Sequence, residues 1–297
     1  MKILLTGATG FIGKEFIRLL QNYYEIIALV RDSSDILVLK NTNCKIVIFS
    51  DYKEINDIFI NNNIDGVVHF ASNIVIEHKL SDIEYLIDSN ITFGTYLLEA
   101  CKCTNVKWFI NTGTFWQNFE SDRYNPVNLY AASKEAFENI AKYYTETSNL
   151  IFTTIKLNDT FGINDTRNKI FNLWYQISQN GESLNMSEGE QIIDISYIED
   201  IINAYKILIE HLNLDNKYDF NNEIFVVTNN EKVSLKELSK IFEDVTSSKL
   251  NINWGERYYR EREVMMPYSV GKIVPNWNQK YSLRQAIQKT IKDMKND

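Results

Sequence analysis

The 297-residue chain contains few of the residues that bind metals or form cross-links, with three cysteines and three histidines. Cys44, Cys101 and Cys103 are odd in number, and the Cys-x-Cys pair has no histidine beside it. We therefore expect neither a disulfide framework nor a metal site, and the reduced thiols favour a cytoplasmic location. The histidines lie in apolar or polar, helix-like sequence and are interpreted as structural or surface residues: His69, His78 and His211.

The chain also lacks an excess of positive charge and a long apolar run. Its formal net charge is -8 with no basic tract, so nucleic acid is not an expected partner. No apolar stretch reaches the length of a membrane span, and glycine and threonine interrupt the first one, in "MKILLTGATG". We expect that run to be a buried strand, and no membrane is an expected partner. Hydrophobic residues make up 44% of the chain, enough for a sizeable core.

Short apolar runs alternate with helical patterns through the first half of the chain. Strands are predicted at 2–8, 25–31, 44–50, 65–72, 106–114 and 151–159, and helices at 13–23, 52–62, 83–104 and from 128. Later helical patterns lie at 199–212, 235–245 and 282–294. This alternation predicts an α/β fold, a Rossmann-type doubly wound parallel sheet with a smaller C-terminal α/β lobe.

Three glycines follow the first predicted strand in "GATGFIG", and an amphipathic helix begins after them. Gly7 allows a tight turn, Gly10 lets the backbone approach a pyrophosphate, and Gly13 lets the helix pack on the strand. A helix N-terminus then faces the anion. The context favours dinucleotide binding over an ordinary strand–helix turn.

The second predicted strand ends in "ALVRDSSD", where an acidic residue would bind the ribose of NAD. Arg31 comes first there, and a guanidinium suits the 2′-phosphate of NADP(H). We therefore expect NADP(H) as the preferred cofactor, with NAD(H) possible; the alternative for Arg31 is a solvated loop cation. Asp51, after the third strand, is a candidate for the adenine amino group or for a helix N-cap.

Tyr130 and Lys134 lie four positions apart in "NLYAASKEAF", which places them on one face of a helix. Amphipathic helices often carry such pairs. A tyrosine titrates near ~10, and a nearby ammonium would lower its pKa toward neutrality. The pair is thus a candidate acid/base group.

The sequence resembles the extended short-chain dehydrogenase/reductase family, which includes nucleotide-sugar epimerases, dehydratases and reductases. The resemblance rests on "TGATGFIG", "VVHFAS" and "YAASK", on the N-x-x-G-T helix "SNITFGTYLLEAC", and on the C-terminal "VPNWNQKYSLRQAIQKTI". These segments span most of the chain. The resemblance implies residues 1–160 as the dinucleotide-binding domain, with segments near 190–215 returning to it, and 161–297 as mainly the substrate lobe.

The resemblance implies that Tyr130 is the catalytic acid/base. It also implies that Lys134 lowers the pKa of Tyr130 and binds the nicotinamide ribose. Thr112, in "TGTFWQ", aligns with the family's catalytic hydroxyl, and Thr114 is a weaker candidate. The alternative for Thr112 is an ordinary strand-end residue. The cofactor contacts implied are Gly7, Thr9, Gly10, Phe11, Ile12, Gly13, Arg31, Asp51, Phe70, Ala71, Ser72, Asn90, Tyr130, Lys134 and Leu157.

Family dehydratases carry an Asp-Glu pair directly after the catalytic hydroxyl, where this chain has Gly113 and Thr114. Without those carboxyl groups, 4,6-dehydration is disfavoured. Arg31 favours an NADPH-dependent C4 reductase of a 4-keto-6-deoxy or 4-keto-3,6-dideoxy sugar nucleotide in surface polysaccharide biosynthesis. Local sequences resemble that reductase group, of which the CDP-abequose and CDP-paratose synthases are examples. An NAD-dependent 4-epimerase is the alternative, and a non-catalytic NADP sensor or scaffold is the alternative of another class.

The substrate implied is a CDP-, GDP- or dTDP-linked sugar, whose diphosphate requires cations. Ile193 stands where the family often has an arginine, so Arg167 and the arginines of "GERYYREREV" are candidates to replace it. A solvated surface is the alternative for that cluster, since glutamates are interleaved with it. Asp159 falls where the family has an asparagine. The substrate contacts implied are Thr112, Thr114, Phe115, Asp159, Arg167, Arg257 and Arg260.

The helices predicted at 83–104 and from 128 have apolar positions at helical spacing. In the family these helices commonly form a four-helix dimer interface, and covering the sheet is the alternative. We expect a homodimer.

Overall fold

The computed structural model describes residues 1–214 and 217–294. Its main element is an eight-stranded sheet in the order β14-β11-β6-β5-β4-β1-β2-β3, and all its strand pairs are parallel. The strands are β1 (Lys2–Thr6), β2 (Glu25–Arg31), β3 (Lys45–Phe49), β4 (Gly66–His69), β5 (Trp108–Thr114), β6 (Ile151–Leu157), β11 (Ile224–Val227) and β14 (Lys272–Ile273). The order 3-2-1-4-5-6 within it is that of the Rossmann fold, which confirms the predicted fold class.

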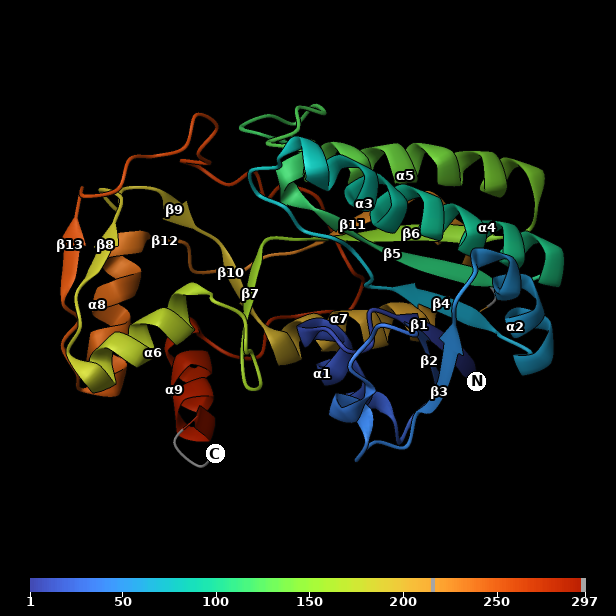
Figure 1. Ribbon diagram of the computed structural model, residues 1–297, viewed down its shortest axis with the longest axis horizontal. Helices are drawn as coiled ribbons and strands as arrows, with labels where there is room; N and C mark the ends of the chain where they lie inside the picture. The colour runs from blue at the N-terminus through green and yellow to red at the C-terminus, as the bar shows by residue number, and fades with distance from the viewer. Residues whose placement is uncertain (215–216, 295–297) are drawn as a thin grey trace.

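Helices cover both faces of this sheet (Figure 1). On one face lie α2 (Ile55–Asn62), α4 (Phe93–Thr104) and α5 (Leu129–Thr147), and on the other α1 (Phe11–Leu20) and α7 (Ile198–His211). Alternate residues of each strand enter two separate cores, as the pleat requires. In β5, Phe109 packs toward α4 and α5, and Trp108 and Ile110 pack toward α1 and α7. Both faces are buried, which explains the nearly continuous apolar runs.

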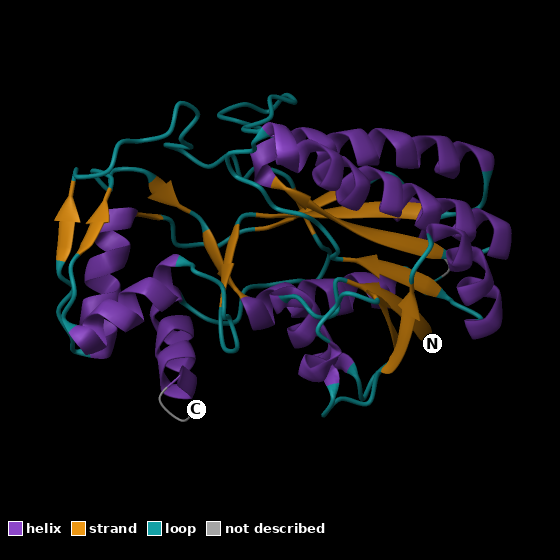
Figure 2. Cartoon of the chain, viewed as in Figure 1, coloured by secondary structure: helices purple, strands orange, loops and turns teal. Residues whose placement is uncertain are grey.

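The second lobe consists of helices and small sheets beyond the carboxyl ends of the central strands (Figure 2). Its helices are α6 (Ile170–Asn180), α8 (Leu235–Thr246) and α9 (Leu283–Met294). Three two-stranded sheets complete it: β7 (Asp159–Phe161) with β10 (Ile195–Tyr197), β9 (Ile192–Ile193) with β12 (Val233–Ser234), and β8 (Leu184–Met186) with β13 (Ile252–Trp254). The predicted helices at 199–212, 235–245 and 282–294 correspond to α7, α8 and α9.

Two parts of the second half return to the main sheet. β11 and β14 extend it beyond β6, in addition to helix α7. The sequence analysis placed neither strand, because "IFVV" and the two residues of β14 are too short to show a period. The Arg-rich segment "GERYYREREV" contains turns and no helix or strand.

The helix predicted at 83–104 is interrupted. It consists of α3 (Ile83–Ile87), a π-helical turn at Asp88–Thr92, and α4. A π turn adds one residue to a helix and is frequent at functional sites. Here it contains Asn90, whose side chain is 1% exposed.

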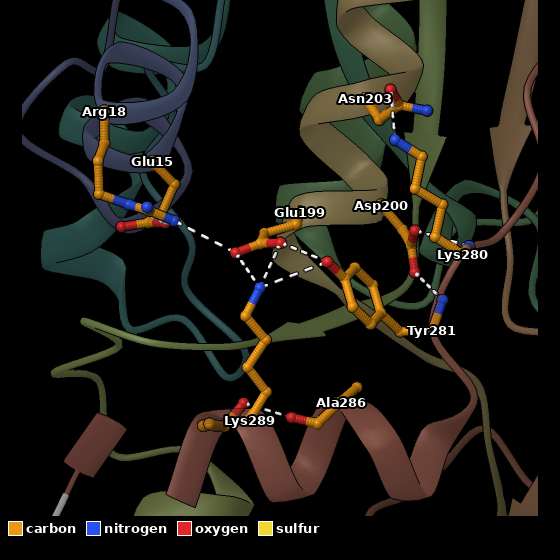
Figure 3. Close-up of polar contacts among 10 residues, drawn as sticks. Glu15, Arg18, Glu199, Asp200, Asn203, Lys280, Tyr281, Ala286 and Lys289 are labelled. Carbon is orange, nitrogen blue, oxygen red and sulfur yellow. Dashed lines mark hydrogen bonds and ion pairs between the residues drawn. The ribbon is translucent and has the colours of Figure 1, made fainter. Parts of the chain in front are cut away.

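A polar network ties the C-terminal helix to the sheet domain (Figure 3). Glu199, at the start of α7, accepts from Lys289 of α9 at 2.7 Å and from the Tyr281 hydroxyl at 3.0 Å. Arg18 of α1 lies 3.6 Å from the Glu199 carboxylate and 2.7 Å from Glu15, which is 1% exposed. The half-buried pair of Lys289 and Glu199 therefore joins the second lobe to the sheet domain.

The cysteines and His69 have structural positions in this fold. The three cysteines are unpaired, and His69 is fully buried, with Nδ1 2.8 Å from the Thr6 hydroxyl. In the part of the chain that the structure describes, no helix has the length and apolarity needed to cross a bilayer.

Candidate active site

The glycine-rich loop after β1 has the shape that a dinucleotide requires. Gly7 has φ +68°, and a Cβ there would lie 2.7 Å from the amide nitrogen of Ala71. A Cβ on Gly13 would lie 2.2 Å from the Gly7 carbonyl, so this glycine lets α1 pack against the loop. Gly10 caps α1 with extended backbone and no side-chain bond, which leaves the first-turn amides free for an anion. The loop therefore fits a cofactor pyrophosphate.

A cavity of about 220 Å³ begins at this loop and extends past the end of β2. Among the described residues that line it, Arg31 alone carries a charge, and Ser34 and Thr9 lie with it. Arg31 is exposed, and its guanidinium carbon lies 5.4 Å from the centre of the Tyr85 ring. A phosphate on the adenosine ribose would meet a cation here and no carboxylate.

Asp51 lies outside the lining of that cavity. Its carboxylate accepts from the Lys53 amide at 2.9 Å, and Glu54 reciprocates at the Asp51 amide, forming a capping box. Of the two roles considered for Asp51, the structure shows the N-cap. The neighbouring Tyr52 lines the cavity and donates to Asp88 at 2.6 Å.

Thr112, Tyr130 and Lys134 come from different elements and meet at a second cavity of about 270 Å³. Thr112 is in β5, and Tyr130 and Lys134 lie one turn apart on α5. Their side chains converge because β5 ends beside the first turns of α5. The same cavity is lined by Gly7, Gly10, Phe11, Ile12, Gly13, Phe70, Ser72, Thr114, Leu157 and Asp159, all of which the sequence had named. We call it the catalytic cavity.

Burial dominates the acid–base properties of the Tyr130–Lys134 pair. It raises the pKa of Tyr130 to about 12, which a hydrogen bond with Ser72 partly opposes. Burial likewise lowers the pKa of Lys134 to about 8, and the nearby Glu138 opposes this shift. Burial thus acts on both groups in this structure, and the lowering of the Tyr130 pKa by Lys134 stays a prediction. At neutral pH Tyr130 is a phenol able to donate a proton.

Gly113 is closely surrounded by side chains of neighbouring elements. Its Cβ would lie 2.9 Å from the Thr154 methyl carbon and 3.0 Å from carboxamide and carboxylate oxygens of Gln117 and Glu138. Gln117 in turn accepts from the Thr114 amide at 2.9 Å. The space that an aspartate would need is thus filled by polar groups from η5 (Phe115–Gln117) and α5. An aspartate at this point would therefore require these neighbours to shift.

Asn90 and Phe115 take supporting positions instead of lining a cavity. The Asn90 side chain accepts from the Asn73 amide at 2.7 Å and from Ser72 at 3.1 Å, and donates to Ser133 at 2.9 Å. Asn90 thus holds the loop after β4 against α5, beside Lys134. Phe115 is 3% exposed and packs in the interior.

A third cavity, of about 300 Å³, is lined by residues of the second lobe and by Ile76 of the loop after β4, and it borders the catalytic cavity. Both cavities are lined by Asp159, Thr160 and Lys169. Arg257 and Arg260, two of the candidate substrate contacts, line the third cavity. Arg260 also lies 3.8 Å from Glu77 of the loop after β4. We call this third space the outer cavity.

The outer cavity has charges that the sequence did not reveal. Lys169 forms an ion pair with Asp159 at 3.0 Å where the two cavities meet. The Asp159 carboxylate, which stands where the family has an asparagine, therefore has a cationic partner. Arg262, considered with the other arginines, donates to Asn125 at 2.7 Å and lies over the Phe119 ring instead of lining the cavity.

Arg167 is held in place by several contacts. Its guanidinium forms a bidentate pair with Asp165 at 2.7 and 2.8 Å and donates to Thr160 at 3.0 Å. It also lies 4.4 Å from the centre of the Phe11 ring, at the start of α1. Arg167 therefore faces the catalytic cavity from the second lobe, next to the glycine-rich loop.

Sequence reasoning missed several residues of the site. Ile74, Asn158 and Lys169 line the catalytic cavity, together with Trp116, which the sequence does associate with the pocket. Tyr205 of α7 lies beneath it, with its hydroxyl 2.7 Å from the Thr112 hydroxyl. Tyr205 follows Thr112 by 93 positions, and no local pattern indicates such a contact.

Comparisons with known proteins match most of the chain. The family model described as NAD dependent epimerase/dehydratase family matches residues 3–226. The CDP-abequose synthase of Salmonella muenchen is 28% identical over 295 residues, covering 98% of this chain and 97% of the relative. That of Yersinia pseudotuberculosis is 28% identical over 294 residues, covering 98% and 100%.

Solved structures share the whole fold. The UDP-glucose 4-epimerase of Thermotoga maritima, with UDP-glucose bound, has a TM-score of 0.86 at 20% identity, and the match covers 100% of this chain and 99% of that one. The UDP-glucuronic acid 4-epimerase of Bacillus cereus, with UDP-glucuronic acid and NAD, has a TM-score of 0.85 at 19% identity with the same coverage. At these identities the likeness shows the fold.

Proposed function

The chain belongs to the NAD dependent epimerase/dehydratase family, and on that premise we propose that it is an NADPH-dependent C4 reductase of a nucleotide-linked 4-keto-6-deoxy or 4-keto-3,6-dideoxy sugar. Membership confirms the resemblance noted in the sequence and the class of NAD(P)-dependent oxidoreductase. The observation that carries the proposal is the meeting of Thr112, Tyr130 and Lys134 at a cavity that the glycine-rich loop also lines.

The chain's own residues supply what a ketone reduction needs besides hydride. NADPH bound along the glycine-rich loop supplies the hydride for C4. Tyr130 donates its phenolic proton to O4, which forms the alcohol and leaves a phenolate. The hydroxyl of Thr112 donates a hydrogen bond to the same oxygen, where negative charge develops. Lys134 provides the ammonium beside the nicotinamide ribose and stabilises the phenolate.

The preference for NADPH is supported by the cavity beside Arg31. Arg31 is the charged residue among its described lining residues, and no carboxylate there repels a 2′-phosphate. A guanidinium is well suited to a phosphate in an open site, because its planar fork donates two parallel hydrogen bonds.

A deoxygenated sugar is supported by apolar side chains around Tyr130. The Trp116 ring lies 6.4 Å from the Tyr130 ring, centre to centre, and Ile74 and Leu157 line the same cavity. These groups favour a methyl at C6 and a methylene at C3 over hydroxyls, since an unpaired hydroxyl loses its water on binding. Gly113 and Thr114 provide no carboxyl group, which disfavours 4,6-dehydration.

The remaining parts of the substrate are assigned to the outer cavity. Arg257, Arg260 and Lys169 line it and are the proposed contacts for the diphosphate. The names of the two CDP-abequose synthases make CDP the first nucleotide to test, ahead of GDP and dTDP. We also propose that the lobe boundary lies near residue 160, and that the protein acts as a homodimer in surface polysaccharide biosynthesis.

The test is consumption of NADPH by the purified protein with CDP-linked 4-keto-6-deoxy and 4-keto-3,6-dideoxy sugars. The expected result is a stoichiometric loss of NADPH absorbance. In Tyr130→Phe the rate of this loss should be about 10²- to 10⁴-fold lower. Tyr143→Phe, an exposed tyrosine on the same helix, is the matched control and retains activity.

Two other outcomes would overturn the proposal. Tightly bound NAD with interconversion of C4 epimers and no net NADPH loss would identify an epimerase. NADPH binding with no turnover of any keto-sugar nucleotide would identify a sensor or scaffold.

A further inference from the structure

The hydroxyl of Tyr205 contacts the catalytic threonine from the face of the sheet that α1 and α7 cover, opposite to α5. Tyr205 is on α7, is 0% exposed, and does not line the catalytic cavity. Its oxygen lies 2.7 Å from the Thr112 hydroxyl, and Thr112 itself does line the cavity. A buried phenol thus contacts a reactive side chain on the side away from the substrate.

The surroundings of Tyr205 fix its position. Its ring packs edge-on against Phe70 with centres 4.9 Å apart, and Phe70 packs against Phe16 at 5.7 Å. Burial raises the pKa of Tyr205 well above its ordinary value; the bond with Thr112 opposes this, and Tyr130 adds to it. Tyr205 is therefore a neutral phenol with one proton to donate.

Two hydroxyl groups at this distance can bond in either direction. If Thr112 donates to Tyr205, its own proton is turned away from the cavity. If Tyr205 donates to Thr112, the Thr112 proton is free for an acceptor in the cavity. A ketone oxygen is such an acceptor, so a bound keto-sugar selects the second arrangement, in which both hydrogen bonds are made. A chain of donors in one direction also strengthens each bond.

We propose that Tyr205 is a positioning residue that donates to Thr112 and thereby directs the Thr112 proton to the substrate carbonyl. This inference rests on the proposed reductase function and deepens it. Tyr205 transfers no proton in the reaction: hydride goes to C4 and the Tyr130 proton goes to O4. Its effect is on the transition state, where negative charge develops on O4 and the Thr112 hydrogen bond shortens.

The test is a double-mutant cycle of Tyr205→Phe and Thr112→Val, with kcat and KM measured for each variant. Tyr205→Phe is expected to lower kcat roughly tenfold, the rate equivalent of about one hydrogen bond, with KM changed less than about twofold. In the Thr112→Val background the same substitution should have almost no further effect, because Tyr205 acts through Thr112. A merely structural role of the Tyr205 hydroxyl would lower kcat equally in both backgrounds, and that result would overturn the proposal.

A matched control is Tyr197→Phe. Tyr197 is 2% exposed, precedes the same helix, and within the described part of the chain its hydroxyl has no hydrogen-bond partner. It should leave kcat and KM unchanged. A Tyr205→Phe variant with wild-type kcat would also overturn the proposal.

The same cycle in denaturant unfolding separates this proposal from the proposed function. The two substitutions should be non-additive in unfolding free energy if the hydroxyls are bonded. A wild type that turns over no keto-sugar refutes the reductase, and an additive unfolding cycle refutes the contact between Tyr205 and Thr112.

Discussion

The cavity beside Arg31 makes cofactor preference the most quantitative property to test. Replacing Arg31 by alanine removes the charge among the described lining residues of that cavity. A 2′-phosphate carries about -1.5 to -2 charges, and each unit pair at ~4 Å in a water-like dielectric is worth about 1 kcal/mol. Because Arg31 is exposed, we use that dielectric and no lower one. The expected loss is about 2 kcal/mol, a roughly 30-fold weaker NADPH affinity.

The assay is a calorimetric titration of NADPH, and separately of NADH, into the purified protein. Arg31→Ala should weaken NADPH about 30-fold and leave NADH within about twofold, since NADH has no phosphate to lose. Arg31→Glu should weaken NADPH by a further factor of similar size, because attraction becomes repulsion. The difference between wild type and variants should shrink near 1 M salt, where the Debye length is about 3 Å.

The control is Lys53→Ala, an exposed cation adjacent to Tyr52 of the same cavity but not part of its lining. A general effect of net charge would weaken NADPH equally in both alanine variants. An unchanged ratio of NADPH to NADH affinity in Arg31→Ala would refute the reasoning from the cavity's charge.

Three further predictions concern the buried carboxyl group of Glu138, the crowding at Gly113, and the dimer expected from the helices at 83–104 and from 128. Burial raises the pKa of Glu138 to about 7, so the folded state binds more protons than the unfolded state between pH 4.5 and 7, and stability from this group falls as pH rises through that window. The difference in unfolding free energy between Glu138→Gln and wild type should therefore favour the variant more at pH 7.5 than at pH 5. An equal difference at the two pH values would contradict this prediction. Gly113→Asp should destabilise by about 1–3 kcal/mol in denaturant unfolding, because Thr154 and Gln117 occupy the space, and it should not produce dehydratase activity; wild-type stability would contradict the crowding. Light scattering after size exclusion should give twice the chain mass of 34.7 kDa, and a monomer would refute the dimer.

Local patterns in the sequence predict the half of the site that depends on neighbours along the chain. The glycine-rich loop, Tyr130 and Lys134 are set by spacings of three or four residues, so the turn and the helix place them without further information. The capping role of Asp51 was readable as well, because Glu54 follows it at the spacing of a capping box.

The other half depends on contacts between distant segments. Lys169 is ten residues from Asp159, and their pairing depends on how β7 and α6 pack. Glu138 reaches Gly113 only because α5 lies against β5. The pKa of Tyr130 depends on how completely the fold buries it, a quantity that motif spacing does not contain. These are tertiary effects, and no single-sequence pattern records them.

The π turn at Asp88–Thr92 gives the chain a property that concerns its tolerance of insertions and deletions. A π turn is an α-helix with one residue added, so removing any one residue of this stretch would restore an unbroken helix. The flanking segments α3 and α4 would keep their faces, and the change would fall on the side chains of the turn itself. Asn90 would turn away from Asn73 and Ser133, and the loop after β4 would lose its anchor beside Lys134. The extra residue therefore makes this helix a place where a single-codon deletion disturbs the active site from outside it.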